Sequence, residues 1–351
     1  MLQIVCAALV LTIPVGLATV FPPPHHRRFV AVAIAGAIGA IASLAVDALL
    51  SAPVDTAGRV LDAAVAAAIA ASVAVLASLR LGSLGGAVFA STWSILVFPA
   101  IAAAVVGSVP SLVQIVFGAV DYAGVLATHV AAAASLIVLS ALPVPPGELG
   151  ATPVSAALGR SAVAVVLVTV GASAWMVGVE RVVNVATGRI LGNAVIGLLL
   201  GALVWALIER IAGRPFAPAG LVAGVVLGWG AIGLGVAFLS PMALAASIVI
   251  GVAGGAAVVL RARDGADPGR RGAIAVIVSV AIGGIVLALL ADGFGMAATG
   301  STALVVGQLG AVLAVGLVSA ASGVICWALA AGAIVLQERV RGGREAPAEP
   351  H

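Results

Sequence analysis

The sequence predicts an all-α membrane protein that crosses the bilayer many times, and two observations support this fold class. Hydrophobic residues make up 63% of the 351 residues and charged residues only 8%, with a mean hydropathy of +1.30. A soluble globular domain is roughly 25% charged, so this composition excludes one. Polar or proline-bearing breaks also separate apolar runs that each reach the roughly 20 residues a membrane-spanning helix needs.

We predict eleven membrane-spanning helices in one domain. The breaks between them, such as "LPVPPGELGATP" and "RARDGADPGRRG", contain the proline, glycine and charge that are typical of loops at a membrane surface. Residues 1–336 form this transmembrane domain, and residues 337–351 form a short cytoplasmic tail that we expect to be disordered. The predicted spans are residues 1–21, 29–50, 59–80, 84–107, 113–142, 160–180, 190–209, 217–239, 242–261, 272–292 and 302–336.

The arginines predict the orientation of these helices. If the N-terminus is outside, thirteen of the sixteen arginines fall in cytoplasmic loops or the tail, and only Arg59, Arg181 and Arg189 fall outside. Positive residues accumulate on the cytoplasmic side, so we expect a cell-membrane protein with its N-terminus outside and its C-terminus cytoplasmic. The arginines are not clustered with aromatic residues, so nucleic acid is not an expected partner.

The number of spans suggests an internal repeat. A break near residues 143–160 divides the chain into five spans, five further spans and one C-terminal helix, which is the plan of two inverted repeats. Alternatively, residues 1–21 are a cleaved signal peptide, which would leave ten spans, although no basic residue precedes the apolar run. In the eighth span Gly220, Gly224 and Gly228 recur every fourth residue and predict close helix packing.

Two ionisable residues lie inside the fifth predicted span, in the stretch "GAVDYAGVLATHV". With the N-terminus outside, Asp121 lies near the outer end of the span and His129 about 12 Å deeper, near mid-membrane. A helix would bring both within about 80° around its axis, so both can face the same interior. Each residue has two interpretations, a hydrogen-bonded packing residue or a marker of a transport pathway.

The same stretch resembles the signature of the ammonium transporter family, which comprises the Amt, Mep and Rhesus proteins. In that signature an Asp, an aromatic residue, Ala and Gly open the fifth span, and a histidine follows eight residues after the Asp; both spacings match here. Other segments are similar in the same order: "ALVLTIPVGLATVF", "RLGSLGGAVFASTWSILVFP" and "LVWALIERIAGRPFAPAGLVAGVVLG". The resemblance covers most of the chain.

This resemblance implies a homotrimer in the lipid bilayer, with a narrow apolar pore for ammonium or ammonia in each subunit. Aromatic side chains hold the cation at the outer mouth, and two histidines on the fifth and tenth spans line the pore. Bare ammonium is costly to bury and neutral ammonia much less so. An imidazole has one donor and one acceptor nitrogen and can exchange a proton with such a solute. His129 corresponds to the first histidine.

The chain departs from the family at the second histidine. Aligning "GGIV" of the tenth span with the family's glycine-rich stretch puts Val280 at that position, or Ser279 if the alignment shifts by one residue. The remaining histidines are His25 and His26, in a predicted cytoplasmic loop, and His351, at the end of the chain. None of them can substitute, so we expect no two-site proton relay.

The outer aromatic site is also reduced. The family's mouth aromatics align with Val65, Val106 and Trp175, and only Trp175 has a ring. Trp175 is either a cation-π surface or a packing residue at the membrane interface. Glu180 could draw cations to the mouth unless Arg181 neutralises it. We therefore expect weak capture of ammonium.

The other polar and aromatic residues predict no further site. Glu209 and Arg210 fit a solvated pair at the cytoplasmic end of the seventh span. No paired carboxylates, metal-ligand spacing or nucleophile-base set occurs in the sequence, so we expect no enzyme activity, cofactor or metal. The remaining tryptophans fit packing or interface positions: Trp93, Trp205, Trp229 and Trp327.

Together these features favour a divergent ammonium-transporter-like channel that conducts neutral ammonia or a similar small solute. The alternative is a non-conducting relative that acts as a sensor or as an assembly subunit.

The arginine distribution leads to a topology prediction. A reporter fused after Arg344 should be cytoplasmic, so a green fluorescent protein should fluoresce there and alkaline phosphatase should be inactive. The same two reporters inserted after Val185, in a predicted outer loop, should give the opposite result. An exported fusion at Arg344 would contradict the predicted orientation.

Overall fold

The computed structural model describes residues 1–21, 26–49, 56–106, 110–143, 157–261 and 267–344, and every regular element in this part of the chain is a helix. His26 was predicted to lie in a loop but is the first residue of the helix that contains most of the second predicted span, while His25 and His351 lie outside the described residues. The helices are α1 (Leu2–Val10), α2 (Thr12–Val20), α3 (His26–Leu49), α4 (Thr56–Leu96), α5 (Phe98–Val106), α6 (Leu112–Phe117), η1 (Leu126–Val130), α7 (Ala131–Ala141), α8 (Leu158–Gly178), α9 (Thr187–Ile211), α10 (Pro218–Gly233), α11 (Pro241–Leu260), α12 (Pro268–Leu290), α13 (Met296–Thr299) and α14 (Ala303–Arg344).

Most of these helices are apolar enough to cross a membrane. By length and composition, eight helical segments qualify among the described residues, and two shorter apolar helices cover residues 126–141 and 218–233. One of the eight is 51 residues long, from Thr56 to Val106, and contains two of the predicted spans. Its helix α4 is broken at Gly82, where a φ of 70° favours glycine, so the chain turns back there. The protein is therefore a multi-pass, all-helical membrane protein.

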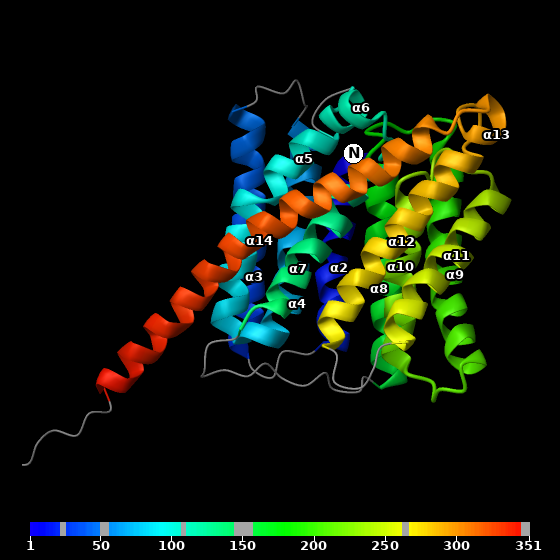
Figure 1. Ribbon diagram of the computed structural model, residues 1–351. Coiled ribbons are helices and arrows are strands. Elements are labelled where there is room, and N and C mark those ends of the chain that lie inside the picture. Colours follow the sequence, from blue (N-terminus) through cyan, green and yellow to red (C-terminus); the bar gives the residue numbers. More distant parts are fainter. Residues whose placement is uncertain (22–25, 50–55, 107–109, 144–156, 262–266, 345–351) are drawn as a thin grey trace, which may run out of the picture.

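The last helix is longer than the sequence analysis predicted. Helix α14 has 42 residues, about 60 Å at 1.5 Å per residue, which is about twice the thickness of a hydrocarbon core. It crosses one face of the bundle obliquely and ends beyond the bundle, at the end opposite the N-terminus (Figure 1). Residues 337–344 of the expected disordered tail are helical, which suits the helix-favouring Gln337, Glu338 and Arg339.

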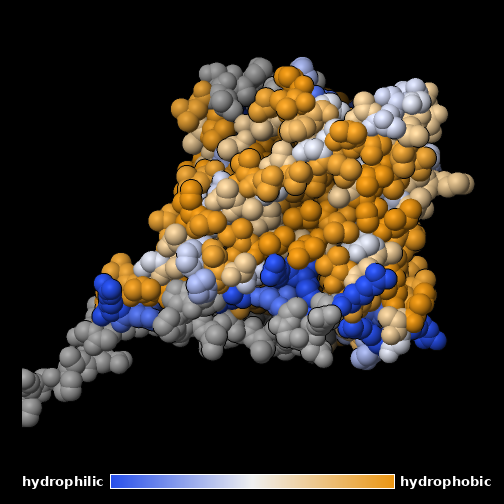
Figure 2. All heavy atoms as spheres, viewed as in Figure 1, coloured by the Kyte–Doolittle hydropathy of each residue, from blue (hydrophilic) through white to orange (hydrophobic). Residues whose placement is uncertain are grey.

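The outer surface suits a lipid environment. Large apolar side chains are exposed on several helices, for example Ile196 and Leu203 on α9 and Leu313 on α14. Figure 2 shows a broad hydrophobic face, with hydrophilic residues gathered at the end of the bundle where α14 leaves it. A patch this extensive would be unusual on a soluble monomer.

Glycines allow α9 and α10 to pack closely, as the Gly220–Gly228 repeat predicted. A Cβ atom on Gly224 would lie 2.8 Å from Trp205 Cβ and would collide with the carbonyl oxygen of Gly201. A Cβ on Gly228 would lie 3.3 Å from Gly201 Cα. The two backbones thus approach to a distance that a larger residue would prevent.

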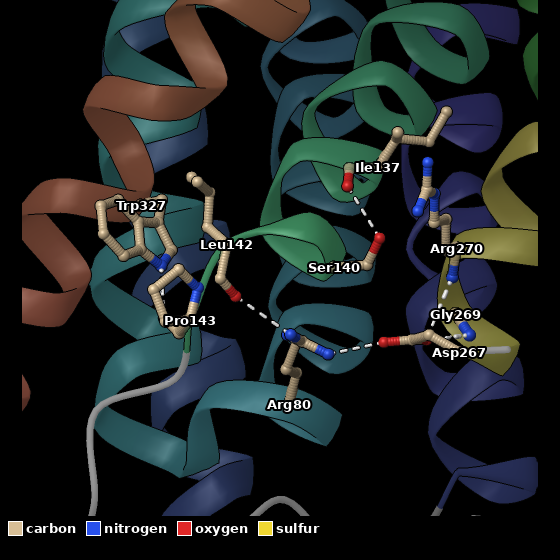
Figure 3. A network of polar contacts seen from close by, with 9 residues as sticks. All are labelled: Arg80, Ile137, Ser140, Leu142, Pro143, Asp267, Gly269, Arg270 and Trp327. Carbon is tan, nitrogen blue, oxygen red and sulfur yellow. Dashed lines mark hydrogen bonds and ion pairs between the residues drawn. The ribbon is translucent and has the colours of Figure 1, made fainter. Parts of the chain in front are cut away.

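An ion pair joins three helix ends at the end of the bundle opposite the N-terminus (Figure 3). Arg80 of α4 donates to Asp267 Oδ2 at 2.6 Å and to the carbonyl oxygen of Leu142, just after α7, at 3.0 Å. Asp267 also caps α12, because its Oδ1 accepts the N–H groups of Gly269 and Arg270 at 2.7 and 3.2 Å. This contact therefore holds the end of α7 against the start of α12, and these two helices also pack against each other.

We predict that Arg80→Ala destabilises the protein by roughly 1–2 kcal/mol, because it removes a charge-assisted hydrogen bond between two partly exposed groups. Melting of the purified protein in detergent measures the change. Arg270→Ala is the matched control, since Asp267 contacts only the backbone of Arg270 in Figure 3. Equal melting of both variants would show that the ion pair does not contribute.

Candidate functional site

The fifth predicted span is not one continuous helix, which corrects the sequence analysis. Helix α6 ends before Gly118, and regular helix resumes only after Gly124; both glycines have positive φ, 64° and 66°. The N–H groups of Tyr122 and Ala123 donate to the carbonyl oxygens of Leu234 and Gly233 at the end of α10, at 3.1 and 3.0 Å. Residues 118–124 are therefore an unwound segment whose backbone is paired with a neighbouring helix end, as an apolar environment requires.

Asp121 lies within this unwound segment and caps the helix after it. Its Oδ1 accepts the N–H of Val125 at 3.0 Å, and its Oδ2 accepts the N–H of Leu126 at 2.8 Å. These donors belong to the first turn of a helix and have no partner within it. The carboxylate is thus directed at the backbone at the start of η1, and it does not face His129 along one continuous helix.

His129 is buried in the short π-helix η1, with 8% of its surface exposed. Its Nδ1 lies 2.9 Å from the hydroxyl oxygen of Thr128, which in turn lies 3.1 Å from the carbonyl oxygen of Gly124. A hydroxyl group has one hydrogen, so both contacts are hydrogen bonds only if Thr128 donates to Gly124 and accepts from His129 Nδ1–H. We assign this tautomer, which leaves Nε2 as a hydrogen-bond acceptor.

Two tryptophans form a stack of rings on His129. The Trp229 indole meets the imidazole edge to face, with ring centroids 4.6 Å apart, and Trp175 meets Trp229 in the same way at 5.5 Å. All three side chains are buried. Trp229 comes from α10, and from the sequence we expected only a packing or interface position for it. Of its flanking glycines only Gly230 faces Val280 and His129, whereas Gly228 faces Gly201, so the sequence held little signal for this contact.

The indole N–H of Trp229 has no hydrogen-bond partner among the residues that the structure describes. An unpaired donor in a buried position costs about 1–3 kcal/mol. Trp229 is 3% exposed, so this cost applies to it.

Both residues aligned with the second histidine are fully buried, but they face different neighbours. A Cβ placed on Gly230 would lie 3.1 Å from Val280 Cγ2 and 3.9 Å from His129 Cδ2, so Val280 and His129 approach the same glycine. The Ser279 hydroxyl instead donates to the carbonyl oxygen of Leu227 at 2.7 Å. The group that reaches the neighbourhood of His129 from α12 is therefore a valine, which has no hydrogen-bonding atom.

Beyond Trp175, the chain places a carboxylate beside aromatic rings. Glu180 Oε1 accepts a hydrogen bond from the Tyr122 hydroxyl at 2.8 Å, and Glu180 Oε2 accepts one from Asn184 at 2.6 Å. The Tyr122 ring contacts Phe238 with centroids 5.8 Å apart, and Phe238 contacts Phe294 at 5.3 Å. Tyr122 is the aromatic residue of the fifth-span signature, but its contacts with Glu180 and Phe238 were not predicted from the sequence.

Arg181 does not neutralise Glu180, although the two are adjacent in sequence. Its guanidinium binds both carboxylate oxygens of Asp62, at 2.9 and 3.1 Å. The backbone of Arg181 has a φ of 58°, which turns it away from the course of the preceding helix. The other two aligned mouth positions are apolar: Val65 is half-buried, and Val106 is exposed and would lie 3.6 Å from a Cβ on Gly124.

Glu209 also differs from the prediction of a solvated pair with Arg210. It is 6% exposed and accepts hydrogen bonds from the Trp205 indole at 2.9 Å and from the Ala217 N–H at 3.2 Å. It therefore joins the end of α9 to the start of α10. In the described part of the chain, no three His, Cys, Asp or Glu side chains are grouped closely enough to hold a metal.

Comparison with known proteins identifies the fold. No family model and no curated protein sequence matches the chain. Among solved structures, it is similar to Saccharomyces cerevisiae Mep2, with 16% identity over 92% of this chain and 86% of that one and a TM-score of 0.72. It is also similar to Candida albicans Mep2 (16%, 99% and 86%, TM-score 0.70) and to a sensor Amt protein (14%, 93% and 91%, TM-score 0.69). The chain therefore has the fold of Amt and Mep proteins, which confirms the resemblance at the level of the fold.

The contacts of Asp121 predict different results for two variants. Asp121→Ala leaves two donors of the η1 turn unpaired, at about 1–3 kcal/mol each, and should lower both folded yield and melting temperature. His129→Ala removes one side-chain hydrogen bond, to Thr128, and one ring contact, with Trp229, but leaves no backbone donor unpaired, so this variant should stay folded. Size-exclusion profiles and melting curves of both purified variants test this. A fully stable Asp121→Ala protein would show that water or other groups replace the carboxylate.

Proposed function

We propose that this protein is an ammonium-transporter-like channel that conducts neutral ammonia, or a similar small neutral solute, past His129. One observation carries the proposal. In an Amt-like fold, the buried imidazole of His129 and the side chain of Val280 approach the same glycine, Gly230, and a valine cannot act as the second titratable group of a relay. A solute that crosses here has to do so without exchanging a proton between two imidazoles.

The surroundings of His129 favour the neutral form of the solute. Val280 on α12 and Val125, at the start of the helix, supply apolar surface, and a charged solute would lose its hydration there at a cost of at least a few kcal/mol. Neutral ammonia loses much less and can donate one N–H to His129 Nε2. The ammonium ion would release one proton to water on the entry side. The resulting ammonia would cross and then take up a proton from water on the other side.

Glu180 is suited to attract ammonium to the entry side. Its carboxylate is held by Tyr122 and Asn184, both neutral, and the adjacent Arg181 is occupied by Asp62. The Tyr122 ring offers a cation-π face next to that charge, worth about 0.5–1 kcal/mol at an exposed site. This arrangement supports recruitment of cations even though Val65 and Val106 lack rings.

We propose that the chain crosses the membrane eleven times. The 51-residue segment counts as two crossings separated at Gly82, and the two shorter apolar helices count as one each, which gives eleven crossings. We further propose two inverted five-helix repeats plus α14, with residues 1–336 as the transmembrane domain. The hydrophilic end of the bundle in Figure 2 suits a cytoplasmic C-terminus and an external N-terminus in the cell membrane. A homotrimer is proposed from the resemblance alone.

A specific observation favours a second function, a non-conducting sensor or assembly subunit. Trp175, Trp229 and His129 pack ring against ring with little exposure, and such a stack can block a narrow pore. A sensor Amt protein is also among the structures that this chain resembles. For either function we propose no catalytic activity and no cofactor.

Flux and current, measured together, test the proposed channel. Proteoliposomes given an ammonium gradient should show rapid internal alkalinisation by stopped flow and no ammonium-evoked current on a supported membrane. His129→Ala should change the rate of alkalinisation, because it removes the acceptor for ammonia. Ser279→Ala is the matched control and should leave the rate unchanged, since its hydroxyl is bonded to Leu227.

Two outcomes would contradict this proposal. A robust current in the wild type that disappears in His129→Ala would show that charge moves through His129. No flux above that of empty liposomes, from protein that is folded, would select the non-conducting alternative.

A further inference from the structure

We propose that the indole N–H of Trp229 is the second polar group of the path beside His129, and that it donates a hydrogen bond to the lone pair of the solute. This inference deepens the proposed function, on which it rests, because it names the chemical class that the same site recognises. That class is small neutral molecules with both an N–H donor and a lone pair, such as ammonia and methylamine.

Trp229 differs in its hydrogen bonding from three of the other four tryptophans of the chain. The indole groups of Trp93, Trp205 and Trp327 donate to oxygens of Ser135, Glu209 and Pro143, at 3.1, 2.9 and 3.2 Å. The Trp229 N–H has no acceptor among the described residues, although its side chain is only 3% exposed. Buried donors are almost always paired, so an unpaired one in a candidate site points to a ligand.

The groups around the Trp229 ring explain why the protein supplies no acceptor. A Cβ on Gly233 would lie 3.6 Å from Trp229 Nε1, and a methyl group of Val125 already approaches that same position. Next to Trp229 in the chain, Gly230 faces both the Val280 methyl group and His129, since a Cβ there would lie 3.1 and 3.9 Å from them. The groups near the indole therefore include the apolar Val125 and Val280 and the imidazole of His129, which it meets edge to face with centroids 4.6 Å apart.

Donor and acceptor chemistry then distinguishes the possible solutes. His129 Nε2 accepts and Trp229 Nε1–H donates. Ammonia has three N–H donors and one lone pair and can use both groups, whereas the ammonium ion has no lone pair and can use only the imidazole. Unlike an imidazole, the indole cannot accept a proton, so it can recognise the solute but cannot relay its proton.

Flux through a variant that keeps an aromatic ring but lacks the N–H is the first test. Trp229→Phe should lower the ammonia flux by about fivefold, the change expected for one neutral hydrogen bond. Trp93→Phe is the matched control, because it also removes a buried indole, one whose partner is Ser135. Melting curves of both variants show whether they are folded. Unchanged flux in folded Trp229→Phe would overturn the inference.

A binding measurement separates this inference from the proposed conduction. In nanodiscs that contain ¹⁵N-tryptophan-labelled protein, the indole resonance missing from Trp229→Phe identifies Trp229. It should shift when methylamine is added at a pH where the neutral amine is abundant, and much less at a lower pH with the same total amine. The Trp93 resonance should not move. A Trp229 shift without flux supports the inference and contradicts only conduction, whereas a fixed Trp229 resonance overturns the inference.

Discussion

The position of His129 depends on how the backbone of one unwound segment is hydrogen-bonded inside an apolar bundle. Residues 118–124 leave the helix between two glycines, and each N–H exposed by the break needs a partner, because the membrane interior supplies none. Asp121 accepts two of these donors, and the end of α10 accepts two more. From the other side, Gln308 of α14 donates to the carbonyl oxygen of Val120 at 2.7 Å. These bonds determine where η1 starts, and hence where His129 lies.

The same bonds couple α10 to the site. Because Gly233 and Leu234 accept hydrogen bonds from Ala123 and Tyr122, the end of α10 is held against the unwound segment. Trp229, one turn earlier on α10, is thereby brought onto the imidazole. A small Val280 on α12 and a large Trp229 on α10 occupy the space around His129 together. A small side chain on one helix is thus accompanied by a bulky ring from another, which keeps the interior densely packed.

Hydropathy and local motifs predicted a multi-helix membrane protein and pointed to two residues of the candidate site. Apolar runs indicated the approximate helix positions, and the spacing in "GAVDYAGVLATHV" singled out Asp121 and His129. They did not predict the break at residues 118–124, because two glycines in an apolar run are compatible with a continuous helix. The burial of Glu209 and the contact of Trp229 with His129 depend on partners far away in sequence. Tertiary packing determines such contacts, and hydropathy patterns do not contain them.

A ring stack over the imidazole can be compatible with both conduction and sensing. An edge-to-face aromatic contact adds only about 0.5–1.5 kcal/mol beyond the burial of its surface. A solute that accepts a hydrogen bond from the Trp229 N–H removes part of the free-energy penalty of that unsatisfied donor. The free energy of binding can therefore offset much of the free energy needed to move the ring. If the displaced ring opens a continuous path, the protein conducts. If the surrounding helices keep the path closed, the same displacement can only report that the solute is bound.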